Sequence, residues 1–326
     1  MNKILTVSVA AYNVSDTIAT TLDSLITDPE TMNRMEVIVV NDGSRDDTSA
    51  KVNEYVERYP DTFRLIDKEN GGYGSTINTS IKLAKGKYFK ELDGGDTYET
   101  ANLPDFINYL ENTDADIIIN PYKEYYIKDE KTELKDDFRT FGRTDALKID
   151  DVTLSNRPGM HGMAFKTSVW NEYKREIPEH CFYTDTEYVA YPFAKAKTIA
   201  FYDKPLYIYF MQCEGQSVSI EGIAAHYRDS VKVMWDLCDA YEKLTGQNEL
   251  TGNSKTIFEM TLNHVIAFAY TLHSVLGKDR MGELKETDTK LKEDYPNIYK
   301  MSGNVKRIKL MRTTGFKCHG LYVKSL

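Results

Sequence analysis

The first hundred residues alternate between short apolar runs rich in β-branched side chains and amphipathic helical patterns, and this alternation restricts the fold more than any other feature. The apolar runs are residues 4–10, 35–40, 63–66 and 88–92, with short connections to the helical segments between them. Such an order predicts a mostly parallel sheet with right-handed crossovers and helices on its faces. The fold class is therefore α/β, and ligands are expected beyond the carboxyl ends of the strands.

Polar residues stand at these predicted strand ends: Tyr12, Asn13, Asp42, Asn70, Asp93 and Asp96. A carboxylate in this place can accept hydrogen bonds from a nucleobase or a ribose, or it can ligate a divalent cation that bridges phosphate oxygens. For a single aspartate a helix N-cap is the simpler interpretation, and Asp96 has Glu99 at capping-box spacing. Capping does not require three acids to converge, so the set as a whole favours a ligand site.

Three further segments carry side chains suited to chemistry. Gly71-Gly72 precedes a helical pattern whose N-terminal amides would favour an anion. In Thr184-Asp185-Thr186-Glu187, which has capping-box spacing, Asp185 either complements the dipole of a helix or acts as a rigidly held general base. His161 lies between apolar neighbours, where a structural histidine is a simpler interpretation than a catalytic one.

Beyond residue 115 the alternation of strand and helix patterns loosens. Further strands are predicted at 116–119, 159–165, 198–202 and 206–210, and a helix at 184–194. Residues 121–157 are polar and are expected to form a variable, strand-poor excursion. After Gly215 the chain carries helical patterns at 223–244, 254–276 and 281–291. We therefore predict two domains, a sheet domain over 1–215 and a helical C-terminal region with a basic tail over 216–326.

The net charge of -9 conceals an asymmetry between the two ends of the chain. Residues 295–326 carry seven Lys and Arg and no acid, whereas the first 294 residues hold 34 basic and 50 acidic side chains. The acidic body argues against a nucleic-acid binder. The tail also contains Val305, Ile308, Leu310 and Met311. It is either a peripheral membrane contact through 304–326 at an anionic leaflet, or a basic segment packed on the acidic body.

Cysteine usage and hydropathy suggest the compartment. The four cysteines are far apart and form no C-x-x-C pair, as expected of free thiols in a reducing cytoplasm. The apolar start is interrupted by Thr6 and Ser8, so it fits a first strand better than a signal peptide. No apolar run of about 18 residues is present. We expect a cytoplasmic protein, at the inner face of the plasma membrane if the tail binds lipid.

Five segments follow one another at a characteristic spacing: Ser8–Asn13, Val37–Ser44, Asn70–Gly72, Ala84–Phe89 and Leu92–Asp96. In this order they resemble the family 2 glycosyltransferases of bacterial type, which have the GT-A nucleotide-diphospho-sugar transferase fold. The resemblance covers residues 1–215, and Gln216-Ser217-Val218-Ser219 is also similar to bacterial members.

The resemblance implies a role for each matching residue. Tyr12 is expected to flank the nucleobase of the donor, Asp42 to bond the edge of that base, and Asp93 to contact its ribose or diphosphate. Asp185 matches the acid that deprotonates the acceptor hydroxyl, and His161 falls on the acceptor side. The full donor-binding set so implied is Ala10, Tyr12, Asn13, Asp42, Asn70, Gly71 and Asp93.

Two departures from the family pattern affect these expectations. The family's Asp-x-Asp signature binds Mn²⁺ or Mg²⁺ through its second aspartate, where this chain has Gly95. The metal is then expected at Asp93 and Asp96, in a weakened or rearranged site. The Gln-x-x-Arg-Trp motif of processive members is absent, so transfer of a single sugar is favoured.

The expected function is inverting transfer of one sugar from a nucleotide-diphosphate sugar, with a UDP-sugar as the usual choice. The acceptor would be the hydroxyl of a glycan or a lipid-linked molecule in the synthesis of cell-surface polysaccharide or glycoconjugate. Two alternatives remain. A nucleotidyltransferase usually has a glycine-rich basic loop after the first strand, and this chain has Ala11-Tyr12-Asn13-Val14 there. A non-catalytic nucleotide-sugar-binding protein is suggested by Gly95.

Overall fold

The computed structural model describes residues 3–212, 220–277 and 280–317. Its larger sheet has eight strands in the order β3-β2-β1-β4-β10-β6-β11-β9, of which β1 to β4 are parallel to one another. Strand β10 is an exception, because it runs antiparallel to both β4 and β6. The sheet is nevertheless mostly parallel, as predicted. The strands are β1 (Leu5–Ala11), β2 (Met35–Asn41), β3 (Phe63–Asp67), β4 (Tyr88–Asp93), β6 (Ile117–Ile119), β9 (Leu147–Lys148), β10 (Met163–Lys166) and β11 (Thr198–Phe201).

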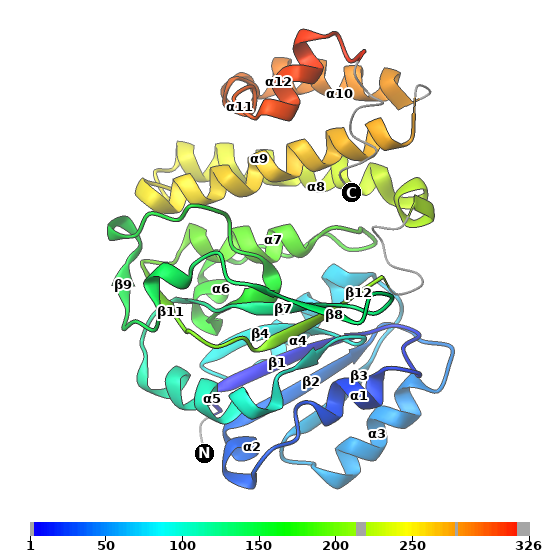
Figure 1. The fold of residues 1–326 in the computed structure, drawn as a ribbon, viewed down its shortest axis with the longest axis vertical. Helices are drawn as coiled ribbons and strands as arrows, with labels where there is room; N and C mark the ends of the chain where they lie inside the picture. The colour runs from blue at the N-terminus through cyan, green and yellow to red at the C-terminus, as the bar shows by residue number, and fades with distance from the viewer. Residues whose placement is uncertain (1–2, 213–219, 278–279, 318–326) are drawn as a thin grey trace.

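Helices cover both faces of this sheet (Figure 1). The apolar side of β1, which includes Val7 and Val9, shares one buried cluster with Ile18, Leu22 and Phe106 from helices on one face. On the other face Ser8 contacts Ser80 of α4 at 2.6 Å between hydroxyl oxygens. The helices are α1 (Ile18–Asp23), α2 (Pro29–Arg34), α3 (Thr48–Arg58), α4 (Tyr73–Leu83), α5 (Leu103–Asn112), α6 (Thr167–Tyr173) and α7 (Asp185–Ala190).

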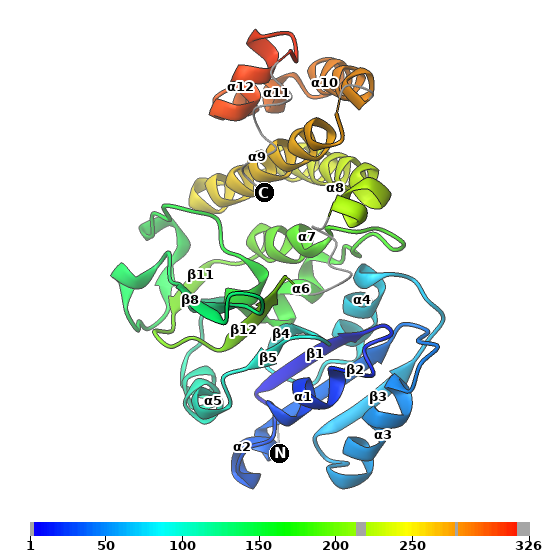
Figure 2. The same ribbon diagram turned by 45° about the vertical axis from the view of Figure 1, so that its right-hand side comes forward.

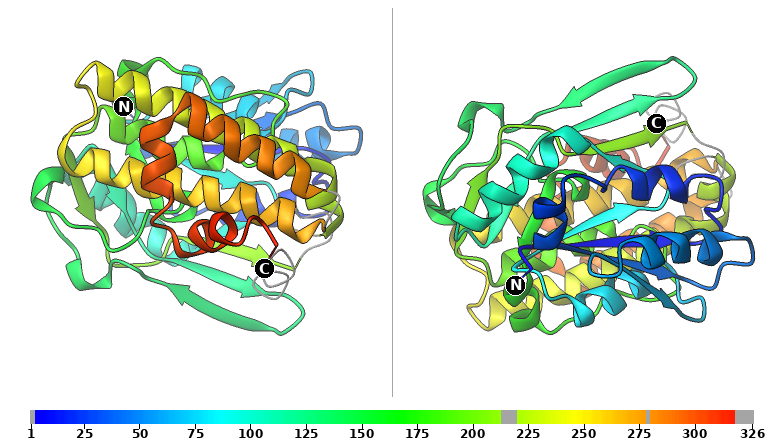
Figure 3. Two further views of the ribbon diagram at one scale, coloured as in Figure 1. Left: turned by 90° about the horizontal axis from the view of Figure 1, so that it is seen from above. Right: turned by 90° about the horizontal axis from the view of Figure 1, so that it is seen from below.

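A second sheet corrects the expectation that 121–157 is strand-poor. It has the order β5-β12-β7-β8 and consists of β5 (Thr97–Tyr98), β7 (Tyr122–Tyr126), β8 (Lys131–Lys135) and β12 (Tyr207–Met211). Strand β7 contains three tyrosines, and aromatic residues favour a strand. The charged residues Lys123 and Glu124 in the same segment made its composition look polar. The hairpin of β7 and β8 extends along one side of the molecule (Figure 3).

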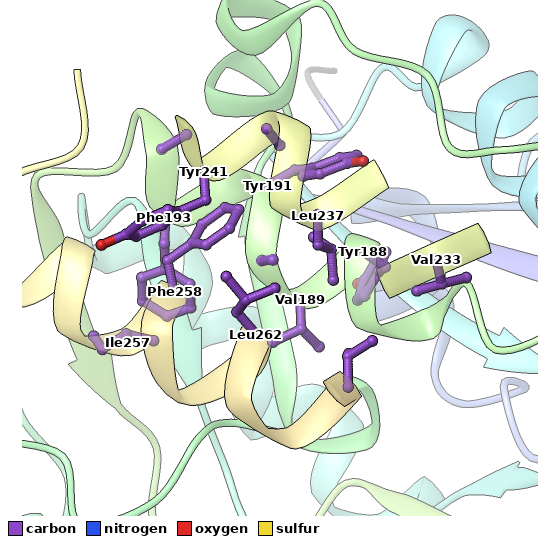
Figure 4. Packing of buried hydrophobic residues seen from close by; sticks show 14 of the residues in the cluster. Tyr188, Val189, Tyr191, Phe193, Val233, Leu237, Tyr241, Ile257, Phe258 and Leu262 are labelled. Carbon is purple, nitrogen blue, oxygen red and sulfur yellow. The ribbon is translucent and has the colours of Figure 1, made fainter. Parts of the chain in front are cut away.

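The C-terminal region is helical, as predicted, and lies over α6 and α7 (Figures 1 and 2). It consists of α8 (Ile220–Gly246), α9 (Gly252–Val275), α10 (Met281–Asp294), α11 (Pro296–Ser302) and α12 (Lys306–Thr313). Its apolar side chains belong to the same buried cluster as those around α7. Figure 4 shows Val189 of α7 among Leu237 of α8 and Phe258 and Leu262 of α9. The predicted boundary near 216 lies outside the described residues, and the core is continuous across it.

The described part of the basic tail packs on the body rather than presenting an apolar face. Ile308 and Met311 of α12 are buried in the main cluster, whereas Leu310 is 40% exposed. Arg312 donates through Nε to Asp288 Oδ1 at 2.7 Å. These contacts favour the packed tail over the membrane segment, because the side chains needed for insertion are already buried; 318–326 lie outside the described residues. None of the helices in the described ranges has the length and apolar character needed to cross a bilayer.

Candidate active site

The register of the parallel strands brings the predicted donor residues to one edge. Ala10 of β1 pairs with Asp93 at the end of β4, and Ala11 pairs with Asn41 at the end of β2. The chain then continues from Asn41 to Asp42, whose N–H donates to Ala11 O at 2.8 Å. The ends of β2, β1 and β4 therefore form one continuous edge, as the alternation of strands and helices predicts.

Asp42 at this edge is 3% exposed and holds a neighbouring turn. Its carboxylate accepts hydrogen bonds from the N–H groups of Gly71 at 2.9 Å and Gly72 at 2.8 Å, and from Lys68 Nζ at 2.9 Å. Asn70 Nδ2 donates to the main-chain oxygen of Asp42 at 2.9 Å. The structure thus connects three predicted donor positions through Asp42. Its contact with a nucleobase stays a prediction, since its oxygens already serve the turn.

The turn after β1 presents Tyr12 to solvent. The Tyr12 side chain is 49% exposed. Asn13 has a φ of 51°, in the left-handed region, and its Oδ1 accepts from Arg45 N at 2.8 Å while its own N donates to Ser44 Oγ at 2.9 Å. Asn is among the residues that tolerate this conformation best. The fixed turn leaves an aromatic ring open at the strand edge, where a base could stack.

Asp93, the last residue of β4, has a buried Oδ1 that forms no hydrogen bond within the described part of the chain. The pKa of Asp93 is raised to about 6, mainly by burial and in a smaller part by the negative charge of Asp185, while the hydrogen bond from the Tyr73 hydroxyl opposes the shift. Buried polar atoms are rarely left without a partner, and such atoms gather at functional sites. Asp93 is therefore a candidate for binding a ligand.

Asp96 corrects one prediction and bears on another. It is 4% exposed, its Oδ2 accepts from the hydroxyl of Tyr207 at 2.6 Å, and its Oδ1 accepts from Phe210 N at 2.8 Å. Both oxygens thus attach the end of β4 to β12, so Asp96 does not cap a helix with Glu99. Its role as a metal ligand stays a prediction, since both oxygens already accept hydrogen bonds. Burial also raises the pKa of Asp96 to about 8, which favours its neutral form.

The donor set for a divalent cation is correspondingly small. No group of three acidic, His or Cys side chains suited to a metal occurs among the described residues. Among the buried atoms of the described residues, Asp93 Oδ1 is a carboxylate oxygen at this strand end that forms no hydrogen bond. Mg²⁺ is often held by one or two carboxylates together with substrate phosphates and water. Asp93 fits a cation shared with a diphosphate, and the site does not fit a metal held by the protein alone.

Asp185 is the first residue of α7 and faces a pocket of about 370 Å³ that also contains Asp93. Burial raises the pKa of Asp185, and the positive charge of Arg157 opposes the shift. The predicted capping box is wrong, because Thr184 makes no capping bond and Glu187 is buried in the core. The pocket is lined by Tyr73, Asp93, Met160, His161, Phe182, Tyr183, Thr184, Asp185, Thr186, Tyr209, Ser230, Val233, His264, Val265 and Phe268.

His161 lines the same pocket from a short 3₁₀ turn, Met160–Gly162, rather than from a strand. Its ring stacks on Tyr209 with centroids 4.4 Å apart and meets the edge of Tyr207 at 4.7 Å. Burial lowers the pKa of His161 to about 3, so the ring is neutral at physiological pH. The structure therefore supports a packing role at the pocket wall, the simpler of the two interpretations.

Several residues of this region have no signal in the sequence that would have selected them. Tyr73 and Tyr209 line the pocket, and Lys68 binds Asp42, yet tyrosine and lysine are common in any surface segment. His264 reaches the pocket from α9, nearly 80 residues beyond Asp185. Only the spatial arrangement identifies these residues, because their spacing follows no local period.

The known proteins and the family model that this chain resembles are glycosyltransferases. The family model described as "Glycosyl transferase family 2" matches residues 6–171. An uncharacterized glycosyltransferase of Rickettsia felis is 31% identical over 161 residues, 49% of this chain and 25% of that protein. RP339 of Rickettsia prowazekii is 35% identical over 40% of this chain and 38% of its own length. The MG025 homolog of Mycoplasma pneumoniae is 28% identical, with 67% of this chain and 71% of that protein aligned.

The matched part of this chain thus spans well under half of the two Rickettsia proteins. Among solved structures, residues 1–349 of S. aureus TarS in complex with UDP-GlcNAc match with a TM-score of 0.65 at 17% identity. That match covers 96% of this chain and 92% of the TarS chain. The same part of TarS with UDP gives a TM-score of 0.60 at 16% identity. At this identity the likeness concerns the fold.

Proposed function

The chain belongs to glycosyl transferase family 2 and has the GT-A fold, and from this premise we propose that it transfers a single sugar from a nucleotide-diphosphate sugar to an acceptor hydroxyl. One observation carries the proposal. Asp93 at the end of β4 and Asp185 at the start of α7 line the same pocket. This supports one acid for the donor and one for the acceptor at a single reaction volume.

The proposed chemistry assigns one task to each acid. Asp185 accepts the proton of the acceptor hydroxyl as its oxygen attacks the anomeric carbon, and in-line attack inverts the configuration at that carbon. Asp93 and the exposed ring of Tyr12 hold the donor at the strand edge. A divalent cation bound between Asp93 and the diphosphate would neutralise the charge that develops on the leaving nucleotide.

The donor and the setting are part of the same proposal. S. aureus TarS shares the fold and was solved with UDP-GlcNAc, so a UDP-sugar is the first donor to test. We place the acceptor in cell-surface polysaccharide or glycoconjugate synthesis, as a glycan or a lipid-linked molecule on the cytoplasmic side. We do not propose membrane contact through 304–326, because the apolar side chains of Ile308 and Met311 are buried.

A donor screen tests the function directly. We expect one uridine nucleotide sugar to bind and to be hydrolysed slowly without an acceptor, in the presence of Mn²⁺. Since the described residues contain no group of three side chains suited to a metal, chelation with EDTA is expected to weaken donor binding by a modest factor, about three- to tenfold. Calorimetry with and without EDTA measures this effect. Absence of binding by every nucleotide sugar tested would contradict the proposed function.

A second candidate, a non-catalytic nucleotide-sugar-binding protein, is supported by Gly95 together with the internal bonds of Asp96. The substitution Gly95→Asp separates the two candidates. A Cβ at position 95 would meet only Thr17 Oγ1, at 3.9 Å, an ordinary van der Waals distance, so the first atom of a side chain is accommodated there. If the chain is an enzyme with a weakened metal site, G95D should strengthen Mn²⁺-dependent donor binding about tenfold and raise hydrolysis.

The matched control for this experiment is Gly95→Asn, which has the same size as aspartate but no charge. It should leave both quantities near those of the unmodified chain. Donor binding that G95D strengthens without any hydrolysis or transfer would favour the binding protein. An equal gain from both substitutions would show that backbone restriction, rather than a metal ligand, is responsible.

A further inference from the structure

A second hollow lies beside the pocket of Asp93 and Asp185. It has a volume of about 210 Å³ and shares His264 of α9 with that pocket. Asn120, which follows β6, and Gly162, which precedes β10, line it. In the sheet order β3-β2-β1-β4-β10-β6, these strand ends lie at the same sheet edge but on the far side of β4 from β1 and β2, which present Tyr12 and Asp42. The hollow is therefore on the acceptor side of the proposed reaction volume.

Arg157 lines this hollow as a partly buried cation that forms no ion pair in the described ranges. Its guanidinium donates to Pro158 O at 3.3 Å and contacts His264 Nε2 at 2.9 Å. Burial lowers the pKa of His264 to about 3, so the imidazole is neutral and can accept a hydrogen bond from the guanidinium. The negative charge of Asp185 acts on Arg157 without a direct contact. Arginine stays protonated in proteins, and its N–H groups that bind no carboxylate here are suited to an anionic ligand.

We propose that Arg157 binds an anionic group of the acceptor, a phosphate or a carboxylate, next to the hydroxyl that Asp185 deprotonates. This inference rests on the proposed glycosyl transfer and names the class of acceptor. A guanidinium pairs with both groups through two parallel N–H···O bonds, which fix orientation as well as position. The proposed function assigns the donor diphosphate to the ends of β1, β2 and β4, so Arg157 remains for the acceptor.

The other charges around the hollow refine the chemistry of the ligand. Lys135 is engaged by Glu124 and Glu133 at 3.0 Å each, so it offers little charge to an incoming anion. Asp136 and Asp137 also line the hollow, and Asp137 Oδ2 accepts from Asn156 Nδ2 at 2.9 Å. Two carboxylates would repel a bare anion but accept hydrogen bonds from hydroxyl groups. The site therefore fits a sugar or polyol that carries one anionic group among several hydroxyls.

Calorimetric titration of the full chain saturated with UDP tests this inference. The probes are glucose 6-phosphate, glucuronic acid and glucose, which differ in carrying a phosphate, a carboxylate or no charge. We expect at least one anionic sugar to bind ten or more times tighter than glucose. The anion that binds tighter distinguishes a phosphate-bearing from a carboxylate-bearing acceptor.

Variants locate the effect at Arg157. In Arg157→Gln the preference for the anionic sugar should vanish, and in Arg157→Lys, which keeps the charge but loses the planar fork, it should be reduced. Arg139→Gln is the control, because Arg139 is an exposed cation of the same segment that does not line the hollow. Thermal melting and UDP affinity of each variant verify folding and an intact donor edge.

The outcomes separate this inference from the proposed function. Equal affinity for the three sugars, no detectable binding of either anion, or a preference that survives in R157Q each overturns the anionic acceptor. None of these results affects donor binding or hydrolysis, on which the proposed function depends. Loss of UDP binding in the unmodified chain would instead contradict the proposed function, whichever sugar the hollow prefers.

Discussion

Replacing Asp185 by asparagine is expected to reduce sugar transfer by about 10²–10⁴-fold, the usual contribution of a positioned general base. Asparagine keeps the size of the side chain at the start of α7 but cannot accept the proton of the acceptor hydroxyl. Donor affinity should change less than twofold, because the donor edge is formed by β1, β2 and β4. Steady-state transfer assays and calorimetry with the donor measure the two quantities separately.

Glu187→Gln is the matched control for that experiment. Glu187 lies two residues further along α7, is fully buried, and has a pKa that burial raises well above its usual range. Burial disfavours its charged form, so glutamine is a small change there and transfer should fall far less than in D185N. Equal loss of activity in the two variants would indicate damage to α7, and full activity in D185N would remove Asp185 from the mechanism.

The pH dependence of transfer provides a second test of Asp185. A general base must be ionised, so the rate should rise with pH as Asp185 loses its proton. Burial raises the pKa of Asp185 above its ordinary value, so this rise should occur at higher pH than for an exposed aspartate. The rise should be absent from the residual activity of D185N.

Replacing Asp93 by asparagine is expected to weaken donor binding by about 30-fold or more, as when one partner of a buried charged contact is removed. The dependence of donor binding on Mn²⁺ should disappear in the same variant, because Asp93 supplies the carboxylate oxygen that fits the cation. Titration of the donor with and without EDTA measures both effects. Asp16→Asn, an exposed change near the same edge, is the charge-matched control.

The same substitution should raise stability while it lowers function. The folded-state pKa of Asp93 is about 6, above the ordinary value of 3.8, so its ionised form is disfavoured in the folded chain. At pH below 4 Asp93 is protonated in both the folded and the unfolded chain and does not lower the free energy of unfolding. As pH rises through 6 this stability is lost, because Asp93 must ionise in its buried position. D93N should therefore melt at a higher temperature at pH 7.5, with the gain vanishing near pH 4. A lower melting temperature at pH 7.5 would contradict this assignment.

The sequence predicted most of the sheet and the donor edge because both depend on short-range patterns. Apolar runs of β-branched residues separated by helical periods leave few alternatives to a parallel sheet. Once the sheet is parallel, Asp42 and Asp93 must share an edge, whichever side chains surround them. Asp185 was found in the same way, from its place at the start of a predicted helix.

What the sequence could not supply depends on contacts between distant segments. The cap predicted at Asp96 is wrong, because its oxygens bind β12, more than a hundred residues later. The sequence left a packed tail and a membrane segment open, and only the structure shows that Ile308 and Met311 have partners in the core. Arg157 could not be selected at all, because its position in a hollow next to the pocket of Asp185 is visible only in three dimensions.

The shared core has a consequence for how such a chain can diverge or be engineered. Val265 of α9 lines the acceptor pocket and also belongs to the buried cluster that joins α8 and α9 to α7. A substitution that reshapes the pocket at this helix must therefore be accommodated by the packing that keeps Asp185 in place. We expect new acceptor preferences to arise at Phe182, which is exposed, and at Arg157 in the neighbouring hollow, before they arise on α9. Exchanging the helical region between relatives as a module should disrupt folding unless the facing side chains of α7 are exchanged with it.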